Sequence, residues 1–239
     1  MPRRARLCLP AVPWHIIQRG NNRAPCFYAP EDYHRYLKTL GELAEQFGCA
    51  VHAYCRMTNH VHLLLTPKRT DSAAAVMKHL GQRYVQYINR TYRRSGTLWE
   101  GRFRSCLTQS EHCVLACHRY IELNPVRAAI VSHPRAYRWS SYRANGEGRA
   151  DALLAPHPEY LRLGRTDDAR RAAYRALFKA RLDPNLLASI RHATNGNFVL
   201  GNKRFETEIA RMLRRRVTPG RAGRPRRATP RATNIAVQR

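Results

Sequence analysis

Acidic residues are scarce in this chain of 239 residues. It has 16 Asp and Glu against 43 Lys and Arg, so its formal net charge is +27. A field of this sign attracts polyanions and raises the rate at which they are encountered. Nucleic acid is the expected partner, because phosphates neutralised by Lys and Arg release their condensed counterions. An anionic membrane surface is the alternative.

Long hydrophobic runs are also missing. No run approaches the roughly 18 apolar residues that a membrane span needs. Residues 1–10 are too short and too interrupted to form a signal peptide. We therefore expect a cytoplasmic, nucleoid-associated protein without a membrane partner. The hydrophobic share of 44% still allows an ordinary core, and the length suggests one domain plus an appendage.

Closely spaced cysteine pairs are absent as well. The seven cysteines contain no CxxC pair and show no small disulfide framework. Cys113 and Cys117 stand four residues apart on an expected helix, near His112 and His118, which makes a zinc site one interpretation. Most structural zinc modules have a closer pair, and free cysteine is commonly buried. We favour reduced, packed cysteines.

Hydrophobic periodicity predicts an α+β fold. The expected strands are residues 12–19, 50–57, 60–66 and 103–108, and the expected helices are 31–47, 72–92 and 110–123. The order β-α-β-β-α-β-α is typical of an antiparallel sheet of four to five strands flanked by helices. These elements define a first domain over residues 1–150.

The rest of the chain is expected to divide into two parts. Residues 151–216 are predicted to be a helical extension, which is either a small helix-turn-helix that reads DNA or a cap on the core. Residues 217–239 are rich in Arg and contain no acid, which predicts a disordered basic tail. Part of this tail resembles a minor-groove Arg-Gly-Arg-Pro hook, but Ala222 interrupts the match, so generic phosphate binding is favoured.

The segment His60-Val61-His62 is the clearest local sign of chemistry. On a strand, residues i and i+2 share a face, so the two imidazoles can bind one divalent ion. The alternative is a pair of half-exposed histidines, because this pattern is common by chance. A third ligand would come from Asn124, Glu122 or a Gln.

Tyr120 and Asn124 are placed i,i+4 near the end of one expected helix, and hence on one face. That helix would present a nucleophile and a carbonyl ligand side by side. The alternative is that Tyr120 packs in the core, as aromatic residues at helical spacing usually do. Other tyrosines compete with it for the role of nucleophile: Tyr84, Tyr87 and Tyr92.

Two segments combine the residue types that bind single-stranded DNA. Trp99, Arg102, Phe103 and Arg104 lie between glycines, and aromatic rings with interleaved Arg suit unpaired bases; alternatively, the two rings fill the core. The second segment is a polar loop whose Asn and Arg side chains suit base edges, unless it is only a turn. It consists of Arg19, Asn21, Asn22 and Arg23.

Several separated segments, in this order, resemble one known family. They are HIIQRG (15–20), VHAYCRMTNHVHLLLTP (51–67), SGTLWEGRFRS (95–105), RYIELNPVRA (119–128) and YRWSSY (137–142). Together they resemble the HUH single-tyrosine transposases, and among these the REP-associated tyrosine transposases, over roughly residues 10–145. The paired histidines alone would be weak, but the agreement of several segments is specific.

The resemblance implies a mechanism and its residues. It implies a ferredoxin- or RRM-like core, with His60, His62 and Asn124 as ligands of Mg²⁺ or Mn²⁺ and Tyr120 as the catalytic nucleophile. A transposase of this type cleaves and rejoins single-stranded DNA next to hairpin, REP-like palindromes through a 5′-phosphotyrosine. It acts as a monomer or a homodimer.

Two other functions remain open at this point. One is a domesticated, non-catalytic regulator that binds hairpin DNA, although such a protein would not require all four site residues. The other is a basic ribonuclease or RNA-binding protein, since a sheet flanked by helices also occurs in RNA-binding modules. The RNP1-type aromatic run of such modules is missing.

Overall fold

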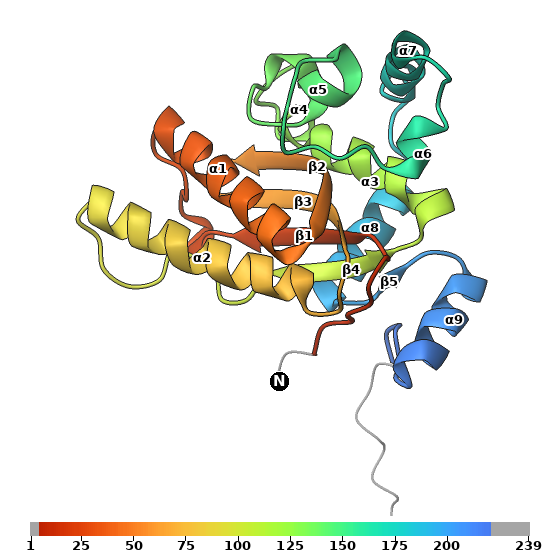
Figure 1. Ribbon diagram of the computed structural model, residues 1–239, viewed down its shortest axis with the longest axis horizontal. Helices are drawn as coiled ribbons and strands as arrows, with labels where there is room; N and C mark the ends of the chain where they lie inside the picture. The colour runs from red at the N-terminus through yellow and green to blue at the C-terminus, as the bar shows by residue number, and fades with distance from the viewer. Residues whose placement is uncertain (1–4, 221–239) are drawn as a thin grey trace, which may run out of the picture.

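A mixed sheet of five strands forms the centre of the computed structural model, which describes residues 5–220 (Figure 1). The strands are β1 (Trp14–Arg19), β2 (Cys49–Met57), β3 (His60–Pro67), β4 (Arg104–Thr108) and β5 (Val199–Leu200), in the order β2-β3-β1-β4-β5. The first four pair antiparallel, whereas β5 pairs parallel with β4. The predicted α+β class is therefore confirmed, and the parallel fifth strand is an addition.

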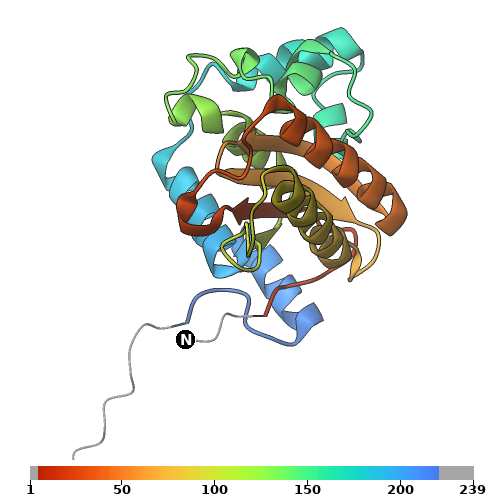
Figure 2. The same ribbon diagram turned by 90° about the vertical axis from the view of Figure 1, so that its left-hand side faces the viewer.

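Helices cover both faces of the sheet (Figure 2). One face packs against α1 (Pro30–Phe47) and α2 (Ser72–Thr91), and the other against α3 (Ser110–Glu122) and α8 (Pro184–Gly196). Alternate residues of β3 separate accordingly. Val61 and Leu63 join the core beneath α1 and α2, so His60 and His62 point toward α3.

The strand register brings the histidine pair to the middle of the second face. His62 lies opposite Ile17 of β1 and Cys55 of β2, while His60 lies opposite Arg19 and Met57. Directly opposed residues in an antiparallel pair point to the same side. Strand β3, which carries both histidines, is therefore hydrogen-bonded to a strand on each side, β1 and β2.

The chain after α3 supplies the remaining elements. They are α4 (Asn124–Arg127), α5 (Tyr142–Glu147), α6 (Pro158–Leu161), α7 (Asp167–Leu177) and α9 (Lys203–Leu213), with short 3-10 helices at Asn21–Arg23 and Pro134–Ala136. Helix α5 follows the second of these 3-10 helices. No helix in the described part of the chain has the length and apolar content to cross a membrane.

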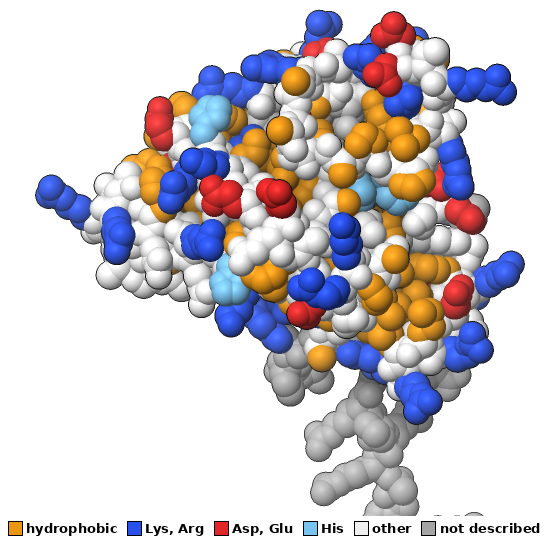
Figure 3. All heavy atoms as spheres, viewed as in Figure 1, with side chains coloured by type: hydrophobic (Ala, Val, Ile, Leu, Met, Phe, Trp, Pro, Cys, Tyr) orange, Lys and Arg blue, Asp and Glu red, His pale blue; other side chains and the backbone are white. Residues whose placement is uncertain are grey.

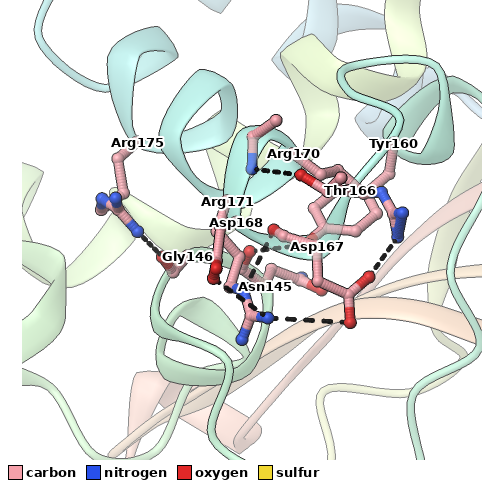
Figure 4. Close-up of polar contacts among 10 residues, drawn as sticks. Asn145, Gly146, Tyr160, Thr166, Asp167, Asp168, Arg170, Arg171 and Arg175 are labelled. Atoms are coloured by element: carbon pink, nitrogen blue, oxygen red, sulfur yellow. Dashed lines mark hydrogen bonds and ion pairs between the residues drawn. The ribbon is translucent and has the colours of Figure 1, made fainter.

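Polar contacts join α5, α6 and α7 (Figure 4). Arg175 donates to the carbonyl oxygen of Gly146 at 2.7 Å, and the Tyr160 hydroxyl donates to the carbonyl oxygen of Asn145 at 2.7 Å. At the start of α7, the Thr166 hydroxyl accepts from the Ala169 amide at 3.2 Å, which satisfies a donor of the first helical turn.

The C-terminal part is joined directly to the sheet. Helix α8 packs on β4, and β5 extends the sheet beyond it. Val217, predicted to lie in a disordered tail, is instead buried, and its carbonyl oxygen accepts from the Val199 amide at 3.0 Å. Burial of this one apolar side chain fixes the segment on the sheet, although the residues around it are basic. The tail residues 221–239, including the hook-like segment, lie outside the described residues.

Two buried histidines remote from the sheet centre predict a loss of stability in acid. Burial lowers the pKa of His52 to about 4 and that of His118 to about 3. In the unfolded chain histidine titrates near 6.5, so between these values the unfolded state binds more protons. Stability therefore falls as the pH falls through this window, by about 2 kcal/mol per histidine between pH 7 and pH 5.

Urea unfolding of the wild type and of His118→Gln at pH 7 and pH 5 measures this effect. The variant should lose about 2 kcal/mol less than the wild type on acidification. His192→Gln, at an exposed position of α8, serves as control and should lose as much as the wild type. Equal losses in wild type and His118→Gln would contradict the prediction.

Candidate active site

The structure brings the predicted nucleophile and the histidine pair together. The His60 and His62 ring centroids are 5.1 Å apart, with the rings at 82°. Tyr120, from the last turns of α3, sets its ring 5.5 Å from that of His62 at 84°. Its side chain is buried, with 6% exposed. A strand-borne imidazole pair and a helix-borne phenol therefore converge on one side of the sheet.

Asn124 completes the group from the start of α4. The main helix ends at Glu122, and Asn124 opens a new turn with Pro125 behind it. The Asn124 side-chain nitrogen lies 3.4 Å from His60 Nε2. Because the amide oxygen and nitrogen exchange on a 180° rotation, the oxygen can occupy the same place. Asn124 is thus next to His60, although on a different helix from Tyr120.

Hydrogen bonds define the tautomer of His60. The Asn59 side-chain nitrogen donates to the carbonyl oxygen of Arg23 at 3.1 Å, which orients the amide. Its oxygen then accepts from His60 Nδ1 at 2.7 Å. Burial, with the charges of Arg19 and Arg127, lowers the pKa of His60 to about 4. His60 is therefore neutral at pH 7, with its lone pair on Nε2 facing Asn124.

A chain of hydrogen bonds from α8 defines the tautomer of His62. Thr194 donates to the carbonyl oxygen of Ile190 at 2.8 Å, so its hydroxyl oxygen accepts from His15 Nδ1 at 2.8 Å. Burial lowers the pKa of His15 to about 3. Neutral His15 therefore accepts through Nε2, 3.0 Å from His62 Nδ1. Because burial also holds the pKa of His62 well below 6.5, the lone pair of His62 lies on Nε2.

Sequence reasoning assigned no role to His15, Thr194 or Arg127. The guanidinium carbon of Arg127 lies 4.4 Å from the centroid of the Tyr120 ring. Its Nη1 is buried and has no hydrogen-bond partner in the described part of the chain. Burial lowers the pKa of Arg127, yet a guanidinium stays protonated in proteins. In the sequence, the sign that Arg127 belongs to the site was its position three residues after Asn124, because that spacing is close to one helical turn.

Other sequence candidates lie away from this group. Glu122, considered as a third ligand, is fully buried and accepts hydrogen bonds from Ser141, Asn145 and Tyr174 at 2.6–2.9 Å. Burial raises its pKa to about 7. The competing tyrosines of α2 donate to groups on the far side of the sheet: Tyr84 to the Cys26 carbonyl, and Tyr87 and Tyr92 to Asp32.

The donor set fits a divalent cation. Two imidazole nitrogens and one amide oxygen are suitable ligands for several divalent metals, and three protein ligands leave positions for phosphate oxygens or water. Among the side chains that the structure describes, no three or more of His, Cys, Asp or Glu form a group that could hold a metal. Cys113 and Cys117 are buried free thiols.

The predicted DNA-binding residues divide into polar side chains that are exposed or half-buried and one aromatic ring that is buried. Asn21, Asn22 and Arg23 are exposed, as is Arg102, while Arg19 and Arg104 are half-buried. The Trp99 ring is 5% exposed and packs against Tyr84, so its faces are not free to stack on bases. Arg104 donates to the side-chain oxygen of Asn195 at 2.9 Å. Basic side chains greatly outnumber acidic ones on the face shown in Figure 3.

The fold is shared with a solved structure. Similar solved structures include a REP-associated tyrosine transposase bound to a REP hairpin, with 14% identity and a TM-score of 0.54, over 66% of this chain and 93% of that chain. Another is described as a transposase from Deinococcus radiodurans R1, with 25% identity and a TM-score of 0.36, over 51% of this chain and 96% of that chain. The first shows a shared fold.

The family follows from the sequence match. Residues 8–124 match the model of the family described as "Transposase IS200 like", and the chain therefore carries a transposase domain of this family. The family resemblance inferred from the motifs is thereby confirmed. No curated protein matches the chain.

Proposed function

We propose that this transposase is a metal-dependent tyrosine endonuclease and strand transferase of the REP-associated branch. It cleaves and rejoins single-stranded DNA next to hairpin sequences, with Tyr120 as nucleophile. The convergence of Tyr120 with His60, His62 and Asn124 on one face of the sheet carries this proposal. The net charge of +27 supports DNA as the partner.

Three side chains would hold the ion. They are His60 and His62, each through Nε2, and Asn124 through its amide oxygen. A bound Mg²⁺ or Mn²⁺ would withdraw charge from the scissile phosphate and orient it. Both imidazoles are neutral and already in the tautomer that ligation needs, so binding requires no proton to leave them.

Tyr120 performs the bond exchange. Its phenolic oxygen attacks phosphorus and forms a P–O bond while the bond to the 3′ oxygen breaks, and the 3′ oxygen takes up a proton to become a hydroxyl. The product is a 5′-phosphotyrosine. Because a phosphodiester replaces a phosphodiester, attack by a 3′-hydroxyl reverses the step and rejoins the strand without ATP.

Arg127 assists that step electrostatically. A phenol with a pKa near 10 needs activation before it attacks at neutral pH. The Arg127 guanidinium lies over the Tyr120 ring, beside the attacking group. Its buried Nη1 has no hydrogen-bond partner among the described residues and can stabilise charge that develops on the phosphate.

The direct test uses labelled single-stranded hairpins taken from the DNA that flanks the gene. With Mg²⁺ or Mn²⁺, we expect a covalent protein–DNA adduct that survives denaturation, together with a free 3′-hydroxyl. Without divalent metal, we expect binding but no adduct. Hairpin binding with no adduct under either condition would instead identify a non-catalytic regulator.

The hydrogen-bond chain behind His62 leads to a separate prediction. Thr194→Val removes the hydroxyl that accepts from His15, so His62 loses its fixed tautomer. Changes to such supporting residues typically weaken metal binding by about 10–100-fold, and we expect about tenfold weaker Mn²⁺ binding by calorimetry. Thr207→Val on α9, whose hydroxyl donates to the Lys203 carbonyl, should bind like the wild type. An unchanged affinity in Thr194→Val would show that the chain does not support the site.

A further inference from the structure

A groove of about 780 Å³ runs along α2, on the side of the sheet away from the histidine pair. One wall is a single face of α2, because its lining residues recur every three or four positions. The other wall is the segment around Trp99 and Phe103, and Arg6, Lys78 and Arg102 also line it. Its volume lies within the roughly 300–1,000 Å³ typical of ligand sites.

Two buried polar atoms in this groove have no partner. Gln18 Oε1 and Trp99 Nε1 make no hydrogen bond within the described part of the chain. Their side chains are 7% and 5% exposed. Buried polar groups in native proteins are almost always paired, so an unpaired donor and an unpaired acceptor that line the same groove point to a ligand that offers the complementary pair.

Gly81 lies next to the Gln18 and Trp99 side chains. It stands in the middle of α2, where glycine is less favourable than alanine. A Cβ at this position would come within 3.8 Å of Gln18 Nε2 and 3.9 Å of Trp99 Nε1. The missing side chain thus leaves space in the groove next to the Gln18 and Trp99 side chains.

Arginines connect the groove to the candidate active site. A small pocket is lined by Arg19, Arg102 and Arg104, and a second by Arg6, Arg102 and Arg104. Arg102 lines both pockets and the groove. Arg19 faces His60 across the β1–β3 pair. The charged residues that line the two pockets are one acid, Glu100, and four cations: Arg6, Arg19, Arg102 and Arg104.

We propose that the groove binds one unpaired nucleobase of the DNA strand whose phosphates follow these arginines from the active site. Trp99 Nε1 donates to the base edge and Gln18 Oε1 accepts from it, while Met77, Val85 and Phe103 contact its faces. The floor of the groove, formed by Trp99 Nε1 and Gln18 Oε1, carries no charge, and the cations lie at the rim. The group bound at the floor is therefore a neutral base and not a phosphate. This inference rests on the proposed function, since it takes single-stranded DNA as the substrate.

The test measures binding of fluorescent single-stranded oligonucleotides by anisotropy without divalent metal, so that no strand is cut. Gly81→Leu fills the groove and should weaken binding about tenfold, in the range expected for one base contact. Gly41→Leu is the matched control on α1, where an added Cβ would meet only Leu153, at 3.9 Å. It should bind like the wild type.

An abasic scan of the oligonucleotide makes the test specific. In the wild type, removing the base at one position should weaken binding about tenfold, whereas in Gly81→Leu the same removal should have no further effect. Gln18→Leu, which keeps the volume but removes the amide, should also suppress this position dependence. It replaces Gly81→Leu if circular dichroism shows that Gly81→Leu is unfolded.

Three results would overturn the base pocket. One is unchanged affinity in both groove variants. Another is a loss of affinity on base removal that is the same at every position of the oligonucleotide and in the wild type and the variants alike. The third is a wild-type dimer that Gly81→Leu converts to a monomer in size-exclusion chromatography, because the groove would then hold a second copy. Failure of the adduct assay, by contrast, would remove the nuclease proposal while leaving these binding results interpretable.

Discussion

Tyr120→Phe is expected to eliminate the covalent protein–DNA adduct and to reduce strand cleavage by at least about 10³-fold, because the attacking oxygen is removed. The ring remains, with its edge-on contacts to His15 and His62. The fold and the affinity for hairpin DNA should therefore stay close to those of the wild type. A strand-nicking assay with Mg²⁺ or Mn²⁺ and an anisotropy titration measure the two quantities separately.

The matched control for this substitution is Tyr92→Phe. Tyr92 was a competitor for the nucleophile on sequence grounds, but its hydroxyl donates to Asp32 at 2.9 Å, far from the histidine pair in the fold. We expect this variant to cleave at the wild-type rate. Normal cutting by Tyr120→Phe, or loss of the adduct in Tyr92→Phe alone, would contradict the assignment of the nucleophile.

Arg127→Gln is expected to lower the cleavage rate by about 100-fold, the effect typical of removing one preorganised charge-stabilising group. The positive charge over the Tyr120 ring disappears, while a polar side chain of similar reach stays. DNA affinity should fall by much less, since one cation in 43 Lys and Arg is lost. Single-turnover cleavage kinetics at saturating DNA isolate the chemical step.

Two further variants separate this role from a general effect of charge. Arg127→Lys keeps the charge without the planar fork and should fall between Gln and wild type. Arg211→Gln, at an exposed position of α9, removes the same charge elsewhere and should leave the rate unchanged. Equal single-turnover rates for Arg127→Gln and wild type would show that Arg127 only packs on the tyrosine.

Local sequence patterns were sufficient to predict strands β1 to β4, the main helices and the shared face of His60 and His62 on β3. Alternation along residues 60–66 predicted that His60 and His62 share a face, and Val61 and Leu63 lie in the core on the other face. The i,i+4 spacing predicted that Tyr120 and Asn124 share one face, and the family resemblance assigned them to the histidine pair; both lie beside the histidines, even though the helix breaks at Leu123. In each case, the relevant partners are close in sequence, or their position follows from strand periodicity.

Contacts between distant segments could not be predicted in this way. The bond from His15 to His62 spans 47 residues and that from His15 to Thr194 spans 179, so no local pattern encodes either. Strand β5 has two residues, too few for periodicity to detect. Trp99 looked suitable for stacking on bases, yet its ring is in the core because Tyr36 and Tyr84 surround it.

The dependence of His62 on Thr194 has a consequence during synthesis. Thr194 belongs to α8, seventy residues after the end of the family match at residue 124. In a nascent chain, Tyr120 and both histidines can therefore leave the ribosome before Thr194 has been synthesised. At that stage no Thr194 hydroxyl accepts the hydrogen bond from His15. His62 therefore acquires its supporting hydrogen bonds only after residue 194 has been synthesised, and we expect the proposed site to reach its full metal affinity only then.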